Sequence, residues 1–264
     1  MLKDKLTLVI HSCEKFSDLW DAHVHLLNQN WGDRNINTLL ITDKETSKSF
    51  NGITIFPAGD RKELPQRMDS ALALIHTEFI FITLDDYFLT NKISSEKIAD
   101  LVSVMEKENL DYIRIFPIPK GKGKIEGYDS LYNINLNENY QVNLYPGLWR
   151  KSFVQKTIRE SLNAWQYEVS LTKIAREIGA VCAMSKGKEF EILDIVRKGK
   201  ILNKANRYLK KHHLYNGSRE IISLRQELKL DFMFYGKELI PNGITKCIKR
   251  FLVKRGHQFY SDVD

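Results

Sequence analysis

The 264-residue sequence has few cysteines and no long apolar run. Its three cysteines, Cys13, Cys182 and Cys247, are odd in number and far apart, which argues against a disulfide framework and against a cysteine-rich zinc site. No apolar segment is long enough to span a bilayer, and Lys3 and Lys5 precede only a short apolar run, so we expect no signal peptide. These absences predict a protein of the reducing cytoplasm.

The signatures of two other classes of protein are also missing. No zinc finger, helix-turn-helix or aromatic RNA-binding motif is recognisable, so we expect no nucleic-acid partner. A sugar-nucleotide nucleotidyltransferase would carry a glycine-rich phosphate loop after its first strand, but residues 11–15 contain no glycine. Such a nucleotidyltransferase and a non-enzymatic protein that binds anionic polymers remain the alternatives to the interpretation developed below.

The net charge of +7 is unevenly distributed. Residues 1–150 carry 17 basic and 21 acidic side chains, whereas residues 151–264 carry 23 basic and 12 acidic ones. A basic excess confined to one part of a chain indicates an anionic partner for that part. A phosphorylated substrate and an anionic membrane surface both meet this condition.

Short apolar strands alternate with helical patterns in the N-terminal half. This pattern predicts an α/β protein with a mostly parallel sheet flanked by helices. The expected strands are 6–10, 38–42, 52–56 and the run that begins at Phe79, and the expected helices begin at Ser17 or Asp18 and at Leu64, the second ending near His76.

The second half of the chain predicts an antiparallel addition and more helices. We expect a helix over 94–109 with Ser95 as its cap, a strand over 112–116, and an exposed loop over 117–127. Two strands, 131–136 and 140–145, would form a hairpin, and helices would follow at 151–160 and 165–178. The expected domains are 1–200, catalytic, and 201–264, a basic and mainly helical extension packed on it.

Two adjacent carboxylates, Asp85 and Asp86, end the central apolar strand. Because buried like charges repel, the pair is expected at an open carboxyl end of the sheet, where ligands bind in such folds. A turn or a helix cap would explain the pair equally well. Other polar residues that follow strands could hold the base, ribose and phosphates of a nucleotide donor, although simple turn chemistry also explains them: His11, Ser12, Asp43, Asp60 and Arg61.

Several stretches together resemble the bacterial GT-A glycosyltransferases that build surface polysaccharides such as capsule or O-antigen. They are residues 65–72 leading into 79–88, then 148–151 and 165–168, and the resemblance covers about residues 6–200. It implies a GT-A-like, Rossmann-like fold and transfer of a sugar from a nucleotide-diphosphate donor, most readily a UDP-sugar. The acceptor would be a hydroxyl of a glycan or of a lipid-linked glycan.

The resemblance also implies roles for individual residues. Asp85 and Asp86 would take the place of the DxD-type motif, which binds Mn²⁺ or Mg²⁺ and the donor diphosphate, although here the acids are contiguous and Tyr87 follows. Arg67 would contact the donor phosphates, unless it belongs to a solvated helix face. Glu168 would be the general base of an inverting enzyme, whereas its place near a helix start also suits ordinary capping.

Aromatic residues could bind the acceptor. Tyr87, Trp149 and Trp165 can stack on sugar faces, although core or rim packing is the commoner fate of such side chains. At the C-terminus, residues 244–255 combine one apolar helical face with five basic residues. This pattern fits a helix on an anionic membrane, which would place the protein on the inner face of the cell membrane, and it equally fits a helix packed on the domain.

Overall fold

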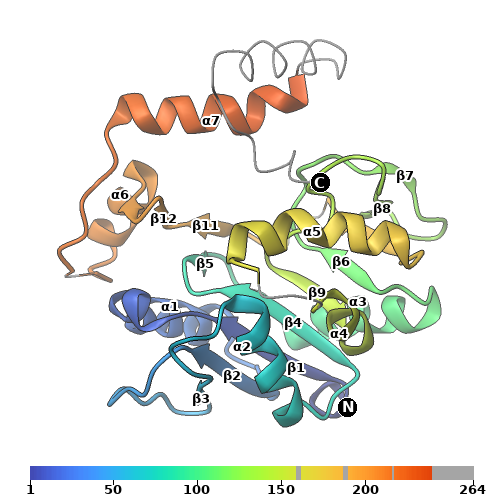
Figure 1. Ribbon diagram of the computed structural model, residues 1–264, viewed down its shortest axis with the longest axis horizontal. Coiled ribbons are helices and arrows are strands. Elements are labelled where there is room, and N and C mark those ends of the chain that lie inside the picture. The colour runs from blue at the N-terminus through green and yellow to red at the C-terminus, as the bar shows by residue number, and fades with distance from the viewer. Residues whose placement is uncertain (159–161, 187–189, 216, 240–264) are drawn as a thin grey trace. The chain divides into compact units, whose positions relative to one another are not determined.

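The computed structural model describes residues 1–158, 162–186, 190–215 and 217–239 (Figure 1). The chain divides into two compact units, Met1–Asp194 and Ile195–Asp264. The boundary expected from the sequence follows residue 200, six residues later than the division found in the structure.

In its described residues, the first unit contains one large sheet, a small one and five α-helices. The large sheet is built from β1 (Leu6–His11), β2 (Asn37–Thr42), β3 (Thr54–Pro57), β4 (Phe79–Leu84), β6 (Tyr112–Arg114), β7 (Lys122–Lys124), β8 (Leu131–Asn133), β9 (Gly147–Arg150) and β10 (Cys182–Ser185). The small sheet pairs β5 (Tyr87–Leu89) with β11 (Ile192–Asp194). The helices are α1 (Ser17–Asn30), α2 (Leu64–Ala71), α3 (Ser95–Lys107), α4 (Lys151–Thr157) and α5 (Ala164–Glu177).

The large sheet has the strand order β3-β2-β1-β4-β9-β6-β10-β8-β7. Its parallel pairs are β2 with β3, β1 with β2, β1 with β4, and β6 with β10. Strand β9 runs antiparallel between β4 and β6, and β8 runs antiparallel between β10 and β7. All strands except β8 and β9 therefore share one direction, which confirms the predicted α/β fold with a mostly parallel sheet and a small antiparallel addition.

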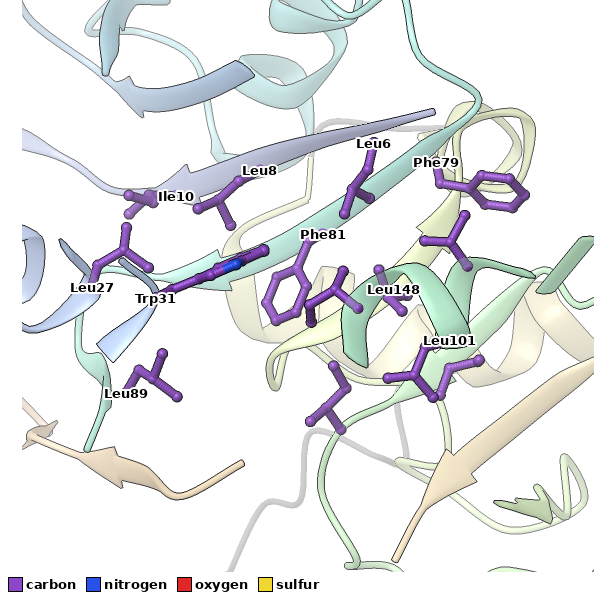
Figure 2. Packing of buried hydrophobic residues seen from close by; sticks show 14 of the residues in the cluster. Leu6, Leu8, Ile10, Leu27, Trp31, Phe79, Phe81, Leu89, Leu101 and Leu148 are labelled. Carbon is purple, nitrogen blue, oxygen red and sulfur yellow. The ribbon is translucent and has the colours of Figure 1, made fainter. Parts of the chain in front are cut away.

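The central strands are apolar on both faces because helices cover both sides of the sheet. Leu6, Leu8 and Ile10 point into the layer formed with α1 and α3, where Trp31 and Phe81 also pack (Figure 2). The alternate residues of β1, such as Val9, lie in the opposite layer with α2, α4 and α5. Side chains alternate along a strand, so a strand buried on both faces has no polar face to expose.

The direction of chain progression across the sheet reverses between β1 and β4. The chain passes from β1 outward to β2 and β3, then returns to pair β4 with the other edge of β1. The chain therefore leaves the carboxyl ends of β1 and β4 toward opposite edges of the sheet. In open α/β sheets this is the place where ligands bind.

The predicted hairpin of residues 131–136 and 140–145 is wrong. Only Leu131–Asn133 forms a strand, and side chains of α5 bind the backbone of the second segment instead. Thr172 Oγ1 accepts from Val142 N at 2.9 Å, and Glu168 Oε1 accepts from Leu144 N at 3.1 Å. These contacts satisfy the amides that a partner strand would otherwise bind.

Other boundaries differ locally. The helix expected to reach His76 ends as α2 at Ala71 and continues as a 3₁₀ turn, and α3 is capped by Ser94, whose side chain accepts from Lys97 N, rather than by Ser95. Within the stretch 117–127, expected as a loop, β7 is exposed and pairs with β8.

The second unit contains β12 (Val196–Arg197) and β13 (Lys200–Ile201), which pair in an antiparallel hairpin, followed by α6 (Asn203–Lys211) and α7 (Leu224–Leu239). This part is mainly helical and basic, as predicted. Residues 244–255, which the sequence predicts as an amphipathic helix, lie outside the described residues. Among the helices that the structure describes, none has the length and apolarity needed to traverse a bilayer.

Candidate active site

Asp85 and Asp86 form the two-residue turn between β4 and β5, at the carboxyl end of β4 and beside that of β1. The backbone N–H of Asp85 donates to the carbonyl of His11 at 3.1 Å, which ties the turn to β1. After the turn, β5 pairs antiparallel with β11, so that Tyr87 lies opposite Asp194. The acidic pair therefore lies where the sheet topology predicts a ligand.

The Asp85 side chain contacts the connection between β1 and α1. It is 5% exposed, and its Oδ2 accepts a hydrogen bond from Ser12 Oγ. The Trp20 indole N–H donates to the same Ser12 oxygen at 2.6 Å, and His23 Nδ1–H donates to the Asp85 carbonyl at 3.1 Å. These contacts fix the carboxylate and the turn that carries it.

The carboxyl ends of β1, β2 and β4 meet near Cys13. Burial raises the pKa of the Cys13 thiol, the carboxylates of Asp85 and Asp43 raise it further, and the positive charge of Arg67 opposes them. The pKa of this one thiol thus responds to three charged groups, Asp43, Arg67 and Asp85. They lie within 42 residues of one another along the chain. Asp43 also accepts from Glu14 N at 2.6 Å and so ties the β1–α1 connection to β2.

His11 lies below this edge, on the face of the sheet covered by α2. Its side chain is 3% exposed, and burial followed by the charge of Arg67 lowers its pKa to about 3. Within the described part of the chain, neither ring nitrogen of His11 has a hydrogen-bond partner. The buried Nε of Arg67 also has none there. The imidazole is therefore neutral. Asp60 and Arg61 are exposed in a turn between β3 and α2.

Glu168 lies on α5, one turn beyond the start of the helix. The cap itself is supplied by Asn163 and Gln166, which form a reciprocal capping box, so Glu168 is not needed for that purpose. Burial raises the pKa of the Glu168 carboxyl, and the hydrogen bond from Leu144 N partly opposes this effect. A carboxylate of raised pKa is a stronger base than an ordinary glutamate.

Three carboxylates act electrostatically on the Tyr87 hydroxyl. Burial raises the pKa of Tyr87 most, and Tyr145, Asp86, Asp194 and Glu168 each raise it further. The Tyr87 ring packs against Tyr145 with 5.0 Å between centroids. Asp85 thus raises the pKa of Cys13, which follows β1, whereas Asp86 and Glu168 both raise the pKa of Tyr87.

Asp194 is a residue of this group that the sequence analysis missed. Its only local signal is an acid at the end of a short apolar segment, Ile192–Asp194. Its proximity to Tyr87 depends on the pairing of β11 with β5, more than 100 residues apart in the chain.

The three predicted acceptor-binding aromatics have different environments. Trp149 is 1% exposed and packs in the core with its ring centroid 4.4 Å from that of Tyr112 and 5.6 Å from that of Phe153. A ring so enclosed has no face for a sugar, so we remove Trp149 from the acceptor surface. Trp165 is 64% exposed at the start of α5, and Tyr87 lies beside the carboxylates.

A divalent ion would depend on the donor for most of its ligands. No group of three or more His, Cys, Asp or Glu side chains suited to a metal is found in the described ranges of the chain. Magnesium is commonly held by one or two carboxylates together with substrate phosphates. Asp85 and Asp86 are the adjacent carboxylates at the carboxyl end of β4 that could supply such ligands.

A separate hollow of about 370 Å³ lies near the other end of α1, lined in part by Asn28, Arg34 and Asn51. None of the predicted site residues lines it. The candidate active site is therefore assigned from topology and side-chain chemistry rather than from this hollow.

The fold of this chain is similar to that of several solved structures. No family model and no curated protein matches the chain. Among solved structures, S. aureus TarS 1-349 in complex with UDP-GlcNAc matches with a TM-score of 0.51 and 12% identity, over 75% of this chain and 60% of that one. The same fragment in complex with UDP matches with a TM-score of 0.50 and 10% identity, over 70% and 59%.

This chain thus spans about three fifths of the length of those TarS fragments. At such low identity the likeness concerns the fold alone. The nine-stranded mixed sheet, its flanking helices and the small antiparallel sheet form a GT-A-like fold, as the sequence resemblance implies.

Proposed function

We propose that the protein is a glycosyltransferase that moves a sugar from a nucleotide-diphosphate donor to an acceptor hydroxyl, with inversion at the sugar carbon. One observation carries the proposal. The Asp85–Asp86 turn lies at the carboxyl end of β4, where the direction of chain progression across the GT-A-like sheet reverses, and its two acids act electrostatically on Cys13 and on Tyr87. Donor and acceptor could therefore meet at one place.

The proposed donor is a UDP-sugar. TarS, which shares the fold, is known in complexes with UDP and with UDP-GlcNAc, and this supports the choice. Here the Arg67 guanidinium supplies positive charge beside the diphosphate, and the ends of β1 and β2, with Asp43, lie where the nucleoside would bind. The neutral His11, at the end of β1, lies beneath these strand ends.

Asp86 is the proposed contact to Mn²⁺ or Mg²⁺ bound with the donor. When bound, such an ion neutralises the negative charge that develops on the departing diphosphate. Asp85, held by Ser12, positions the turn so that Asp86 stays in place. Asp194 adds negative charge to the same region.

In the proposed reaction, Glu168 accepts the proton of the acceptor hydroxyl as its oxygen bonds to the anomeric carbon. The bond between that carbon and the diphosphate oxygen breaks, and the nucleoside diphosphate leaves with the electron pair. The hydrogen bond from Leu144 N fixes one oxygen of Glu168 and leaves the other for the proton. Tyr87 and the exposed Trp165 are the proposed acceptor contacts. We propose a surface glycan, free or lipid-linked, as the acceptor.

A screen of sugar nucleotides for binding and slow hydrolysis, with and without Mn²⁺ or Mg²⁺, tests the proposal. We expect release of the nucleoside diphosphate, whereas a nucleotidyltransferase would form or consume pyrophosphate instead. Asp86→Asn should weaken metal-dependent donor binding about tenfold or more, and Asp100→Asn, the same change on the exposed side of α3, should not. Binding of no sugar nucleotide would overturn the assignment, and indifference to chelation would remove the ion from it.

A further inference from the structure

Two consecutive residues connect the proposed base with the acidic turn. The backbone N–H of Leu144 donates to Glu168 Oε1 at 3.1 Å. The ring of the next residue, Tyr145, packs against that of Tyr87 with 5.0 Å between centroids. Because Tyr87 directly follows Asp86 in the chain, these two contacts link α5 to the turn between β4 and β5.

Tyr145 is also held from the side of β6. Its ring stacks on that of Phe116, with 4.4 Å between centroids and 11° between the planes. The fully buried Arg114 donates from Nε to the carbonyl of Phe116 at 2.9 Å and from Nη1 to that of Gln141 at 2.6 Å. Hydrogen bonds from a charged donor are stronger than those between neutral groups, so Arg114 anchors both Phe116 and the start of the segment that carries Tyr145.

The backbone of residues 142–145 has anchors that do not involve the Tyr145 ring. Thr172 Oγ1 accepts from Val142 N at 2.9 Å and donates to Val142 O at 3.2 Å. Tyr145 N donates to Asn143 Oδ1 at 3.2 Å. A variant that lacks only the Tyr145 ring should therefore keep this segment folded.

We propose that Tyr145 is a positioning residue of the transfer reaction, whose ring contact with Tyr87 keeps the acidic turn at a fixed place relative to Glu168. This role rests on the glycosyltransferase function proposed above. The base comes from α5 and the acids from the β4–β5 turn, so a change in their spacing would separate the acceptor hydroxyl from the anomeric carbon. Misplacement of reacting groups by about 1 Å can lower a rate about 100-fold.

The alternative role of the Tyr145 ring is purely structural, because aromatic side chains commonly fill space at the rim of a domain. In that case its removal would lower stability and leave the reacting groups where they are. Enzyme kinetics separate the two roles. Loss of transition-state geometry lowers kcat, whereas loss of donor contacts raises KM.

Hydrolysis of the sugar nucleotide that the screen above selects tests the proposal, since water then takes the place of the acceptor hydroxyl. In Tyr145→Leu, which lacks the ring, we expect kcat to fall about tenfold to a hundredfold while KM changes less than about threefold. Tyr145→Phe retains the ring and should restore kcat to within about twofold of the unchanged protein. Burial is the main cause of the raised pKa of Glu168, so the acidic limb of the Leu variant should move to lower pH as water reaches the carboxyl.

Tyr128→Leu is the matched control. Tyr128 is also half-buried, its hydroxyl donates to Glu108 Oε1 at 3.1 Å, and it packs with the layer of α1 and α3. This variant should lose stability in urea and keep its kcat and its acidic limb. Circular dichroism checks that every variant is folded.

The possible failures of this experiment are distinguishable. A screen that finds no donor would remove the proposed function and the role of Tyr145 together. With a donor in hand, the role alone is overturned if Tyr145→Leu lowers stability but leaves kcat and the acidic limb unchanged. Equal loss of kcat in Tyr145→Phe and Tyr145→Leu would also overturn it, because the ring contact survives in the Phe variant.

Discussion

Replacing Glu168 by Gln removes the proposed proton acceptor while preserving its shape. The amide oxygen of Gln can still accept from Leu144 N, a bond of 3.1 Å, so the segment that follows Val142 should stay in place. Only the ability to take a proton is lost. General-base catalysis contributes about 10²- to 10⁴-fold, so we expect turnover to fall by this factor, which corresponds to roughly 3–5 kcal/mol of transition-state stabilisation.

Stability should respond in the opposite sense. Burial makes the charged form of Glu168 unfavourable, which is why its pKa is raised. A neutral Gln avoids that cost, so the free energy of unfolding at neutral pH should be unchanged or higher. The assay measures release of nucleoside diphosphate from the donor, and urea unfolding measures stability. Glu177→Gln, the same change at an exposed site of α5, is the control and should alter neither.

The pH dependence gives a further check on this residue. The base must be ionised to act, so the rate should fall as the pH drops through the raised pKa of Glu168. The acidic limb should therefore lie above the ordinary glutamate value of about 4.3. Full transfer activity in Glu168→Gln would refute the assigned base, and so would an acidic limb that the substitution leaves in place.

Three further predictions concern the framework of the site. Ser12→Ala leaves the buried Asp85 carboxylate without one donor and should lower the free energy of unfolding by about 1–3 kcal/mol in urea titrations; an unchanged midpoint would contradict the role given to this contact. Arg114 is fully buried and donates to the carbonyls of Phe116, Gln141 and Pro119. Arg114→Leu should therefore lower the free energy of unfolding by about 3 kcal/mol or more in the same titrations. A smaller loss would show that these carbonyls find other donors. Burial lowers the pKa of His11 to about 3 and of His23 to about 4. As the pH falls below about 6.5, the unfolded chain therefore takes up protons that the folded chain does not, and the free energy of unfolding should decrease by up to about 1.4 kcal/mol per pH unit per histidine. Unfolding curves that coincide at pH 7 and pH 5 would contradict this.

The strands and the acidic end of the central strand could be predicted from the sequence because their signals are local. The run that begins at Phe79 is apolar on both faces, and a strand of this kind needs helices on both sides of its sheet. The strand ends at Asp85 and Asp86 as expected, but Asp85 is buried, because the Ser12 hydroxyl donates to its carboxylate. The start of α5 is also a local feature, since Asn163 precedes the helix.

The failures come from contacts between distant segments. The stretch around Val142 alternates like a strand, but its amides bind Thr172 and Glu168 of a helix that follows later in the chain. Trp149 looks like a candidate for sugar stacking in the sequence, and its burial follows from the placement of β9 between β4 and β6. Neither outcome has a signal within a short window of residues.

The sequence by itself determined the alternation of strands and helices and the presence of an acidic pair at a strand end, because these depend on side-chain polarity along a few neighbouring residues. Only the tertiary structure decided the surroundings of each of the two carboxylates. Ser12, 73 residues before Asp85, binds one carboxylate, while Asp194 and Glu168 act with the other on the pKa of Tyr87. Such groupings depend on which strands pair and which helices cover them, and that is settled by packing across the whole sheet.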